Sequence, residues 1–272
     1  MKKPNTRRNL DVAIEKIVGD RDQAIQTKRY MANIILAQML PECVIKGGSS
    51  IKIRLGNASS RYSLDLDTAR SIKLEEFTDK LEDNLSKGWD DFTGHLVEKN
   101  PAKPLNVPEA YVMQPFEVKL QYMGRPWITI PLEIGHNEIG DANEADIVEP
   151  VDLYDIFNEL SLKKPGSIRL MRLEHQIAQK LHGVSEPNSI RAHDLIDLQL
   201  IVDNSLIDYK KVKDICIRLF NYRKMQSWPP VVVENEGWDE LYSSQALDLN
   251  VLQNVSEAVD WCNKLIADIN NS

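Results

Sequence analysis

The chain has 272 residues, of which 42% are hydrophobic and 27% are charged, as in an ordinary soluble globular protein. Its net charge of −8 argues against nonspecific coating of nucleic acid, which needs a broadly basic surface. Three cysteines lack metal-ligand or disulfide spacing and no apolar segment fits a membrane span or a signal peptide, so we expect reduced thiols in a cytoplasmic protein that does not enter a membrane.

Two amphipathic helices are predicted at the start of the chain. Apolar residues recur at helical spacing through residues 9–19 and 21–40, and Pro41 ends the second segment. The short apolar run Val44–Ile45 follows and predicts a strand, which leads into a further helix after a glycine pair. Because amphipathic helices bury their apolar faces, we expect both N-terminal helices to pack against the sheet that contains this strand.

The turn between this strand and the next helix has the composition of a phosphate-binding site. Its residues are Lys46, Gly47, Gly48, Ser49 and Ser50. Glycines allow the backbone to approach a ligand closely, while serines cap a following helix and donate hydrogen bonds to phosphate. We therefore expect this turn to bind a phosphate-bearing ligand.

Two aspartates end the alternating segment that follows the turn signal Gly56–Asn57. A strand over residues 61–67 would bury Tyr62, Leu64 and Leu66 and present on its other face Arg61, Ser63, Asp65 and Asp67. The carboxylates of Asp65 and Asp67 would then project side by side, about 6.5–7 Å apart. Because they repel each other, they need a cation, and Mg²⁺ completed by substrate phosphates is the natural partner. The alternative is a glycine turn followed by two exposed aspartates.

This region resembles the motifs of a known enzyme superfamily. Gly47-Gly48-Ser49 followed by Asp65-x-Asp67 is similar to the first motif of the polymerase-β nucleotidyltransferase superfamily. The longer pattern resembles the AbiEii/AbiGii toxin family, which includes the MenT tRNA-modifying toxins, and it adds Lys46, Ser50, Arg61 and Ser63. The gap between the glycines and the aspartates is longer than in the general superfamily and close to the spacing of the toxin branch. The resemblance implies that the aspartates bind metal and that the other motif residues bind the nucleotide.

A helix over residues 73–86, a proline-containing loop at 100–108 and a β-hairpin are predicted next. The hairpin strands run from Phe116 to Tyr122 and from Trp127 to Ile134. Glu133 is a single carboxylate between two apolar residues of the return strand. The superfamily resemblance implies that such a strand supplies the third metal-binding acid, and Glu133 fits better than Glu117 or Glu138. The alternative is an ordinary outward-facing glutamate.

The second half of the chain is predicted to be helical, beyond an acidic segment at residues 137–150 that we take as a domain boundary. Helices are expected at residues 168–182, 190–202, 208–222 and about 248–269. We find no chemical motif in the last two.

Two of these helices resemble the second signature of the AbiEii/AbiGii family. The first contains Lys180, and the second contains the run Arg191-x-x-Asp194-x-x-Asp197. The resemblance implies that Lys180 and Asp194 contribute to the active site, where a lysine beside a triphosphate supplies charge for the leaving group. The alternative is a set of ion pairs that holds the two helices together. For Arg191 and Asp197 a structural role and a functional role both stay open.

We therefore expect an α/β (α+β) fold, with a polymerase-β-like nucleotidyltransferase domain containing a mixed sheet at residues 1–145 and a mainly α-helical domain at residues 146–272. The resemblance implies a bacterial toxin–antitoxin or phage-defence toxin that transfers nucleotides from NTP to RNA, with tRNA as the acceptor and a separately encoded antitoxin. Two Mg²⁺ ions would be held by Asp65, Asp67 and Glu133. Two other functions remain open: a small-molecule nucleotidyltransferase of the aminoglycoside-modifying kind, which the acidic composition fits, and a non-catalytic nucleotide-binding interaction module.

An RNA acceptor would need local positive charge on this acidic protein. The basic residues nearest the glycine turn are Lys46, Lys52, Arg54 and Arg61. We expect these four residues, with the basic N-terminus as a further candidate, to form a confined track that contacts RNA phosphates. The alternative for each one is a solvated charged face.

Overall fold

The computed structural model describes residues 2–56, 59–61, 63–100 and 113–272. The chain forms two compact units. The first contains Met1–Asn57, Ser63–Asn137 and Ala145–Leu170, and the second contains Ala58–Tyr62, Glu138–Glu144 and Met171–Ser272. The expected division into domains between residues 145 and 146 stays a prediction, and most of the expected loop at 100–108 lies outside the described residues.

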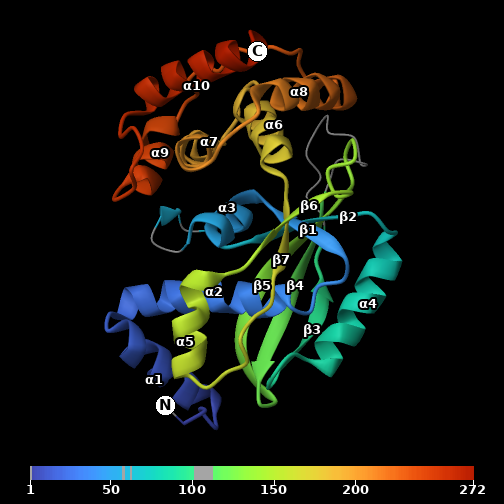
Figure 1. The fold of residues 1–272 in the computed structure, drawn as a ribbon, viewed down its shortest axis with the longest axis vertical. Helices are drawn as coiled ribbons and strands as arrows, with labels where there is room; N and C mark the ends of the chain where they lie inside the picture. Colours follow the sequence, from blue (N-terminus) through green and yellow to red (C-terminus); the bar gives the residue numbers. More distant parts are fainter. Residues whose placement is uncertain (1, 57–58, 62, 101–112) are drawn as a thin grey trace. The chain divides into compact units, whose positions relative to one another are not determined.

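A mixed sheet forms the centre of the first unit (Figure 1). Among the described residues its seven strands lie in the order β3-β4-β5-β2-β1-β7-β6. Their bounds are β1 Cys43–Lys46, β2 Leu66–Arg70, β3 Phe92–Glu98, β4 Gln114–Tyr122, β5 Arg125–His136, β6 Ala145–Val148 and β7 Ile168–Met171. β2 pairs antiparallel with β1 and parallel with β5, while β4 and β5 form the expected antiparallel hairpin. The predicted α/β fold with a mixed sheet is confirmed.

Helices of the first unit pack on one face of this sheet. Their bounds are α1 Arg7–Val18, α2 Arg21–Ala37, α3 Gly47–Leu55, α4 Leu74–Lys87, the 3₁₀ helix η3 Val151–Leu153 and α5 Tyr154–Glu159. One continuous core joins apolar residues of these helices with Ile45, Leu66 and Leu132, which occupy a single face of their strands. The opposite face of the same strands therefore remains available for polar side chains.

The alternation in the hairpin predicted its buried face. Phe116, Val118, Leu120 and Tyr122 of β4 are all buried. Intermediate exposure is found for the residues between them, because consecutive side chains of a strand point to opposite faces.

Two predicted elements differ from the structure. The strand expected at residues 61–67 is instead β2, which begins at Leu66, and Leu64 is 49% exposed. Alternation alone does not show where a strand begins to form its hydrogen bonds. The helix expected at 168–182 is also divided, because residues 168–171 form β7 beside β1 and the helix begins at Leu173.

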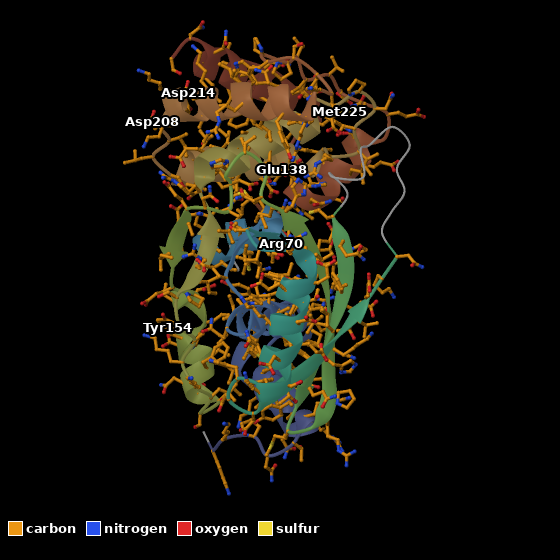
Figure 2. The ribbon with its side chains drawn as sticks, turned by 90° about the vertical axis from the view of Figure 1, so that its right-hand side faces the viewer. Arg70, Glu138, Tyr154, Asp208, Asp214 and Met225 are labelled. Carbon is orange, nitrogen blue, oxygen red and sulfur yellow. The ribbon has the colours of Figure 1, made fainter. Side chains whose placement is uncertain are left out.

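The second unit is helical. Its helices are α6 Leu173–Val184, α7 His193–Asn204, α8 Tyr209–Arg223, α9 Trp238–Ala246 and α10 Val255–Asn270. Asp208, labelled in Figure 2, caps α8 by accepting a hydrogen bond from the backbone N–H of Lys211 at 3.2 Å. The helix predicted from residue 248 begins only at Val255, and α9 was not predicted.

The cysteines are buried in both units. Cys43 lies in β1, while Cys216 and Cys262 lie in α8 and α10. Burial raises the pKa of Cys43 and of Cys262 to about 12. All three are free thiols, as the sequence predicts. None of the described helices combines the length and the apolar character that crossing a membrane requires.

Candidate active site

The turn between β1 and α3 brings the backbone close to the carboxylate of Asp67. Gly47 has a φ of +65°, in the left-handed region that glycine adopts without strain. A Cβ added to Gly47 would lie 2.0 Å from Oδ2 of Asp67. Any other residue here would have to displace the carboxylate. The N-terminus of α3, where backbone N–H groups favour anions, therefore begins beside Asp67.

Lys46, Asp67 and Glu133 lie in one row across three neighbouring strands. Asp67 is in register with Lys46 of β1 on one side and with Glu133 of β5 on the other. Side chains in register on adjacent strands share a face, so the row lies on the face opposite the apolar core. The Nζ of Lys46 lies 3.2 Å from the position of a Cβ added to Gly135, two residues after Glu133. The ammonium group of Lys46 therefore lies close to β5, the strand that carries Glu133.

Asp65 lies one residue before β2 and is exposed. Its backbone carbonyl accepts a hydrogen bond of 2.6 Å from Oγ of Ser49 in α3. This bond holds the chain that carries Asp65 against the helix that begins at the glycine turn. Ser63 is only partly buried, and it lies in the irregular segment before the strand.

Both serines of the glycine turn are buried. Ser49 is 2% exposed and Ser50 is fully covered. Asn33 of α2 lies behind them, and its Nδ2 donates to Oγ of Ser49 at 3.5 Å. A phosphate bound at this turn would therefore meet backbone N–H groups before serine hydroxyls. The sequence reasoning did not identify Asn33, although a polar residue beside Ile34 on a mostly apolar helix was an available signal.

The acidic residues of the first unit suit a hard cation that the protein and its substrate bind together. Within the described part of the chain, no three Asp, Glu, His or Cys side chains converge into a preformed metal cluster. Mg²⁺ is usually held by one or two carboxylates together with water and substrate phosphates, rather than by an all-protein cage. The in-register pair of Asp67 and Glu133 provides such carboxylates, and exposed Asp65 lies two residues before Asp67.

The second unit contains a buried cluster of ion pairs between α6 and α7. Nζ of Lys180 lies 2.8 Å from Oδ1 of Asp194 and 2.6 Å from Oδ2 of Asp197. Arg191 contacts the other oxygen of Asp194 at 2.6 Å. Nε and Nη2 of Arg61 each donate to Asp197 at 2.8 Å. This arrangement gathers all four residues of the second signature and adds Arg61, which the sequence pattern placed beside Asp65.

Ion pairing keeps both aspartates charged despite their burial. Burial by itself raises the pKa of Asp194, but Arg191 and Lys180 outweigh it and hold the pKa below its ordinary value. Burial likewise opposes ionisation of Asp197, and Arg61 and Lys180 lower its pKa. Lys180 is 4% exposed, so it is a fixed cation inside the unit. Its pairs join two helices inside the protein and are not surface pairs, which contribute little.

The confined basic track predicted beside the glycine turn is wrong. Lys46 is 9% exposed and Lys52 is 4% exposed, with its Nζ 5.6 Å from the ring centre of Tyr30. Arg54 forms an ion pair with Asp146 at 2.9 Å. Arg61 is held by Asp197. The prediction failed because a long basic side chain can bury its aliphatic stem and find a partner that is distant in sequence.

Comparison with protein families gives a match over most of the chain. Residues 29–262 match the family described as "Nucleotidyl transferase AbiEii toxin, Type IV TA system". The chain belongs to the AbiEii nucleotidyltransferase toxin family. It is accordingly a nucleotidyltransferase, and the resemblance to this family seen in the sequence is confirmed. No curated protein matches the chain.

A solved structure of a nucleotidyltransferase toxin shows the same fold. The nucleotidyltransferase toxin MenT4 from Mycobacterium tuberculosis H37Rv is 15% identical, with a TM-score of 0.59 over 98% of this chain and 90% of that one. JHP933 from Helicobacter pylori is 17% identical, with a TM-score of 0.46 over 92% of this chain and 93% of that one. At these identities the similarity to MenT4 establishes the fold alone.

Proposed function

We propose that this AbiEii nucleotidyltransferase acts in the cytoplasm, needs Mg²⁺, and transfers nucleotides from NTP to an RNA acceptor, which we take to be tRNA. A separately encoded antitoxin would restrain it. The observation that supports this proposal best is the row of Lys46, Asp67 and Glu133 beside the start of α3. It places acidic oxygens next to a helix N-terminus that favours phosphate.

Each residue of the row has a proposed role. Asp65, Asp67 and Glu133 would hold two Mg²⁺ ions, which when bound neutralise the triphosphate and make an acceptor hydroxyl more acidic. Asp67 or Glu133 would accept the proton that leaves this hydroxyl. Lys46 and the backbone of Gly47 and the residues after it would orient the phosphates.

Lys180 and Asp194 are proposed to contribute from the helical unit. Lys180 is fixed by two carboxylates, and a fixed charge stabilises a transition state without having to reorganise. Arg61 and Ser63, which the family pattern associates with the nucleotide, stay in the proposed binding set. For Arg61 the bidentate pair with Asp197 supports a positioning role better than a direct phosphate contact.

The test is transfer from labelled NTP to total tRNA with and without Mg²⁺. Asp67→Asn and Glu133→Gln should each abolish transfer while the fold is retained. Glu117→Gln provides a matched control, because Glu117 lies on β4 of the same sheet but outside the row. Transfer that survives in Asp67→Asn, or that proceeds without a divalent ion, would refute the proposed role of the acids.

A small-molecule acceptor of the aminoglycoside kind is the second candidate. It is favoured by the burial or pairing of the four basic residues expected to contact RNA. Incubating the protein with an aminoglycoside panel beside total tRNA separates the two acceptors. Mass spectrometry of cellular RNA after expression without antitoxin tests the RNA acceptor directly. Unmodified RNA together with a modified aminoglycoside would favour the small-molecule acceptor over RNA.

A further inference from the structure

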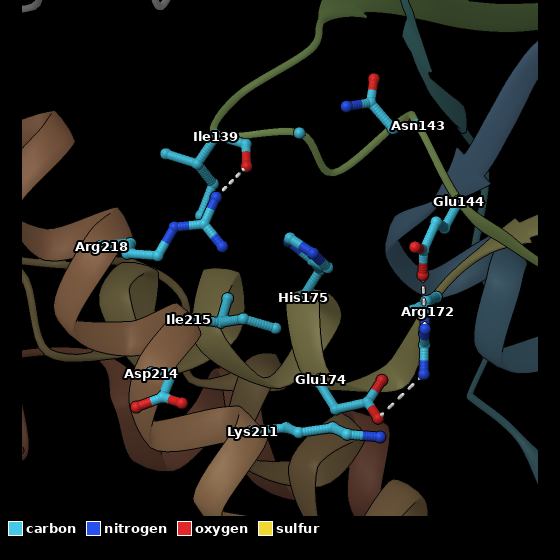
Figure 3. A pocket seen from close by; sticks show the side chains of 11 residues that line it. Ile139, Asn143, Glu144, Arg172, Glu174, His175, Lys211, Asp214, Ile215 and Arg218 are labelled. Carbon is cyan, nitrogen blue, oxygen red and sulfur yellow. Dashed lines mark hydrogen bonds and ion pairs between the residues drawn. The ribbon is translucent and has the colours of Figure 1, made fainter.

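A pocket of about 370 Å³ lies within the second unit, formed by the start of α6, the middle of α8 and the segment 138–144. His175 of α6 and Arg218 of α8 project into it, and Lys211 of α8 borders it (Figure 3). None of its lining residues belongs to the row of acids or to the buried ion cluster. We propose that this pocket binds the phosphodiester backbone of the acceptor RNA, a proposal that rests on the RNA acceptor of the proposed function.

Two of the cations that line the pocket, Arg218 and Lys211, are positioned to contact a ligand. Arg172 is 2.5 Å from Glu144 and 3.4 Å from Glu174, so its charge is offset by two carboxylates. Arg218 donates instead to the neutral backbone carbonyl of Ile139. This bond fixes the guanidinium, which has five N–H donors in all, without neutralising it.

Lys211 is the second of these cations. Its Nζ lies 3.8 Å from the carboxylate of Asp208, and both side chains are about half exposed. A surface pair of this kind is weak. Lys211 is therefore able to exchange Asp208 for a phosphate at small cost.

The spacing of the two cations favours a chain of phosphates over a single one. Lys211 and Arg218 are seven residues apart on α8, which is two helical turns or about 10 Å along the axis. Side chains that leave the helix this far apart can each contact a different phosphate of one strand. His175 also lines the pocket, and burial together with the charge of Arg218 lowers its pKa. The imidazole of His175 therefore contributes to the pocket as a neutral hydrogen-bonding group.

Three carboxylates of the pocket oppose this ligand, and Arg172 contacts two of them, Glu144 and Glu174. The third, Asp214, lies on α8 between Lys211 and Arg218. In Figure 3 its carboxylate points away from His175. Its exposure to water limits the repulsion, because solvent screens charges at a surface.

α8 also offers a matched control. Lys210 and Lys224 are exposed cations of the same helix and its C-cap, but they do not line the pocket. The pocket variant Lys211→Gln/Arg218→Gln and the control variant Lys210→Gln/Lys224→Gln change the net charge equally. A general electrostatic effect would weaken RNA binding to the same extent in both, whereas a built site would weaken it only in the first.

The experiment measures direct binding of tRNA over a series of salt concentrations, together with transfer. The pocket variant should reduce the slope of log affinity against log salt by about two, since each phosphate contact contributes about 0.9. The control variant should keep most of the wild-type slope, and ATP binding should be unchanged in both. Asp214→Asn should tighten tRNA binding, while Asp260→Asn, an exposed change on α10, should not.

The outcomes separate this inference from the proposed function. Equal tRNA affinities and slopes for the pocket and control variants would overturn the inference even if transfer to tRNA occurs. Selective loss of binding in the pocket variant would support it even if no transfer to tRNA is found. If the pocket variant does not fold, the absence of any effect of Asp214→Asn would overturn it. Loss of antitoxin binding alone would assign the pocket to a protein partner.

Discussion

Arg61 and Asp197 are 136 residues apart in the chain and form a two-pronged ion pair, with Nε and Nη2 of the arginine each donating to one carboxylate oxygen at 2.8 Å. The planar guanidinium matches both oxygens at once. Asp197 is buried and Lys180 contacts it from the other side. Arg61 is therefore joined to the helices of its own unit through a charged contact that is largely shielded from water.

Arg61→Lys should lower the free energy of unfolding, because a lysine cannot reproduce the fork. We expect a loss of about 1–3 kcal/mol, the range for a buried charged hydrogen bond left incomplete. Urea unfolding measures it. Arg54→Lys is the control, since Nη2 of Arg54 pairs with Asp146, whose side chain is 36% exposed, whereas that of Asp197 is buried. Equal losses in the two variants would mean that the bidentate geometry adds nothing to the free energy of unfolding beyond an ordinary ion pair.

Lys180→Ala should destabilise the helical unit, because it leaves Asp194 and Asp197 with fewer buried cations. Breaking a buried pair in this way costs about 3–5 kcal/mol. Transfer must therefore be measured per folded molecule, at a temperature where the variant is still native. A strong loss of specific activity, not fully restored by Lys180→Arg, is expected if the lysine acts on the triphosphate. Normal specific activity in a destabilised variant would assign Lys180 to structure alone.

The stability of the helical unit should depend on pH through His193. Burial lowers the pKa of His193 to about 4, below its ordinary value of about 6.5. The unfolded chain therefore takes up a proton between these values that the folded unit does not. The free energy of unfolding should fall as the pH drops from about 6.5 to about 4, by at most about 3 kcal/mol.

His193→Gln should flatten the dependence in that window while leaving a second one at lower pH. Because the pKa values of Asp194 and Asp197 are lowered in the folded unit, their contribution is present above the ordinary aspartate value of about 3.9 and is lost below it. Chemical unfolding followed at a series of pH values measures both windows. An unchanged slope in His193→Gln between pH 6.5 and 4 would contradict this assignment.

Gly47→Ala should abolish transfer. Its Cβ would need the space of Oδ2 of Asp67, at 2.0 Å, so the carboxylate must move. Gly19→Ala is the control, since Gly19 also has a positive φ, of 80°, but no atom lies within 4 Å of an added Cβ. Both variants should lose about 1 kcal/mol of unfolding free energy through backbone strain. Transfer measured per folded molecule should be lost only in Gly47→Ala, and retention there would show that Asp67 need not be fixed.

Local patterns predicted the elements whose partners are close in sequence. The alternation from Phe116 to Tyr122 identified a strand with one buried face, because the hairpin pairs it with residues a few positions later. The glycine turn likewise marked the start of α3 correctly. In each case the periodicity and the turn chemistry of a few residues determine the local structure.

Contacts between distant residues could not be read in this way. Leu170 fitted a helical stripe as well as a strand, and its pairing with Ile45 of β1 decides for the strand. The sequence did not show that Asp67 and Glu133 face each other in register, only that both are acids on strands. Lys52 looked like a surface residue because nothing near it in the chain indicates Tyr30, whose ring lies near its ammonium group.

The order in which the chain visits its two units limits how the protein can be divided. The chain contributes Ala58–Tyr62 and Glu138–Glu144 to the helical unit before it has supplied Ala145–Leu170, with β6 and β7, to the sheet. No truncation at a single peptide bond yields one unit complete and free of the other. A shortened chain that ends at residue 145 would expose the unpaired edge of β1 and be prone to aggregation. Neither unit can therefore be transferred to another protein, or used as half of a split reporter, as one continuous segment. Exchanging a unit between related proteins would require several segments to be replaced together.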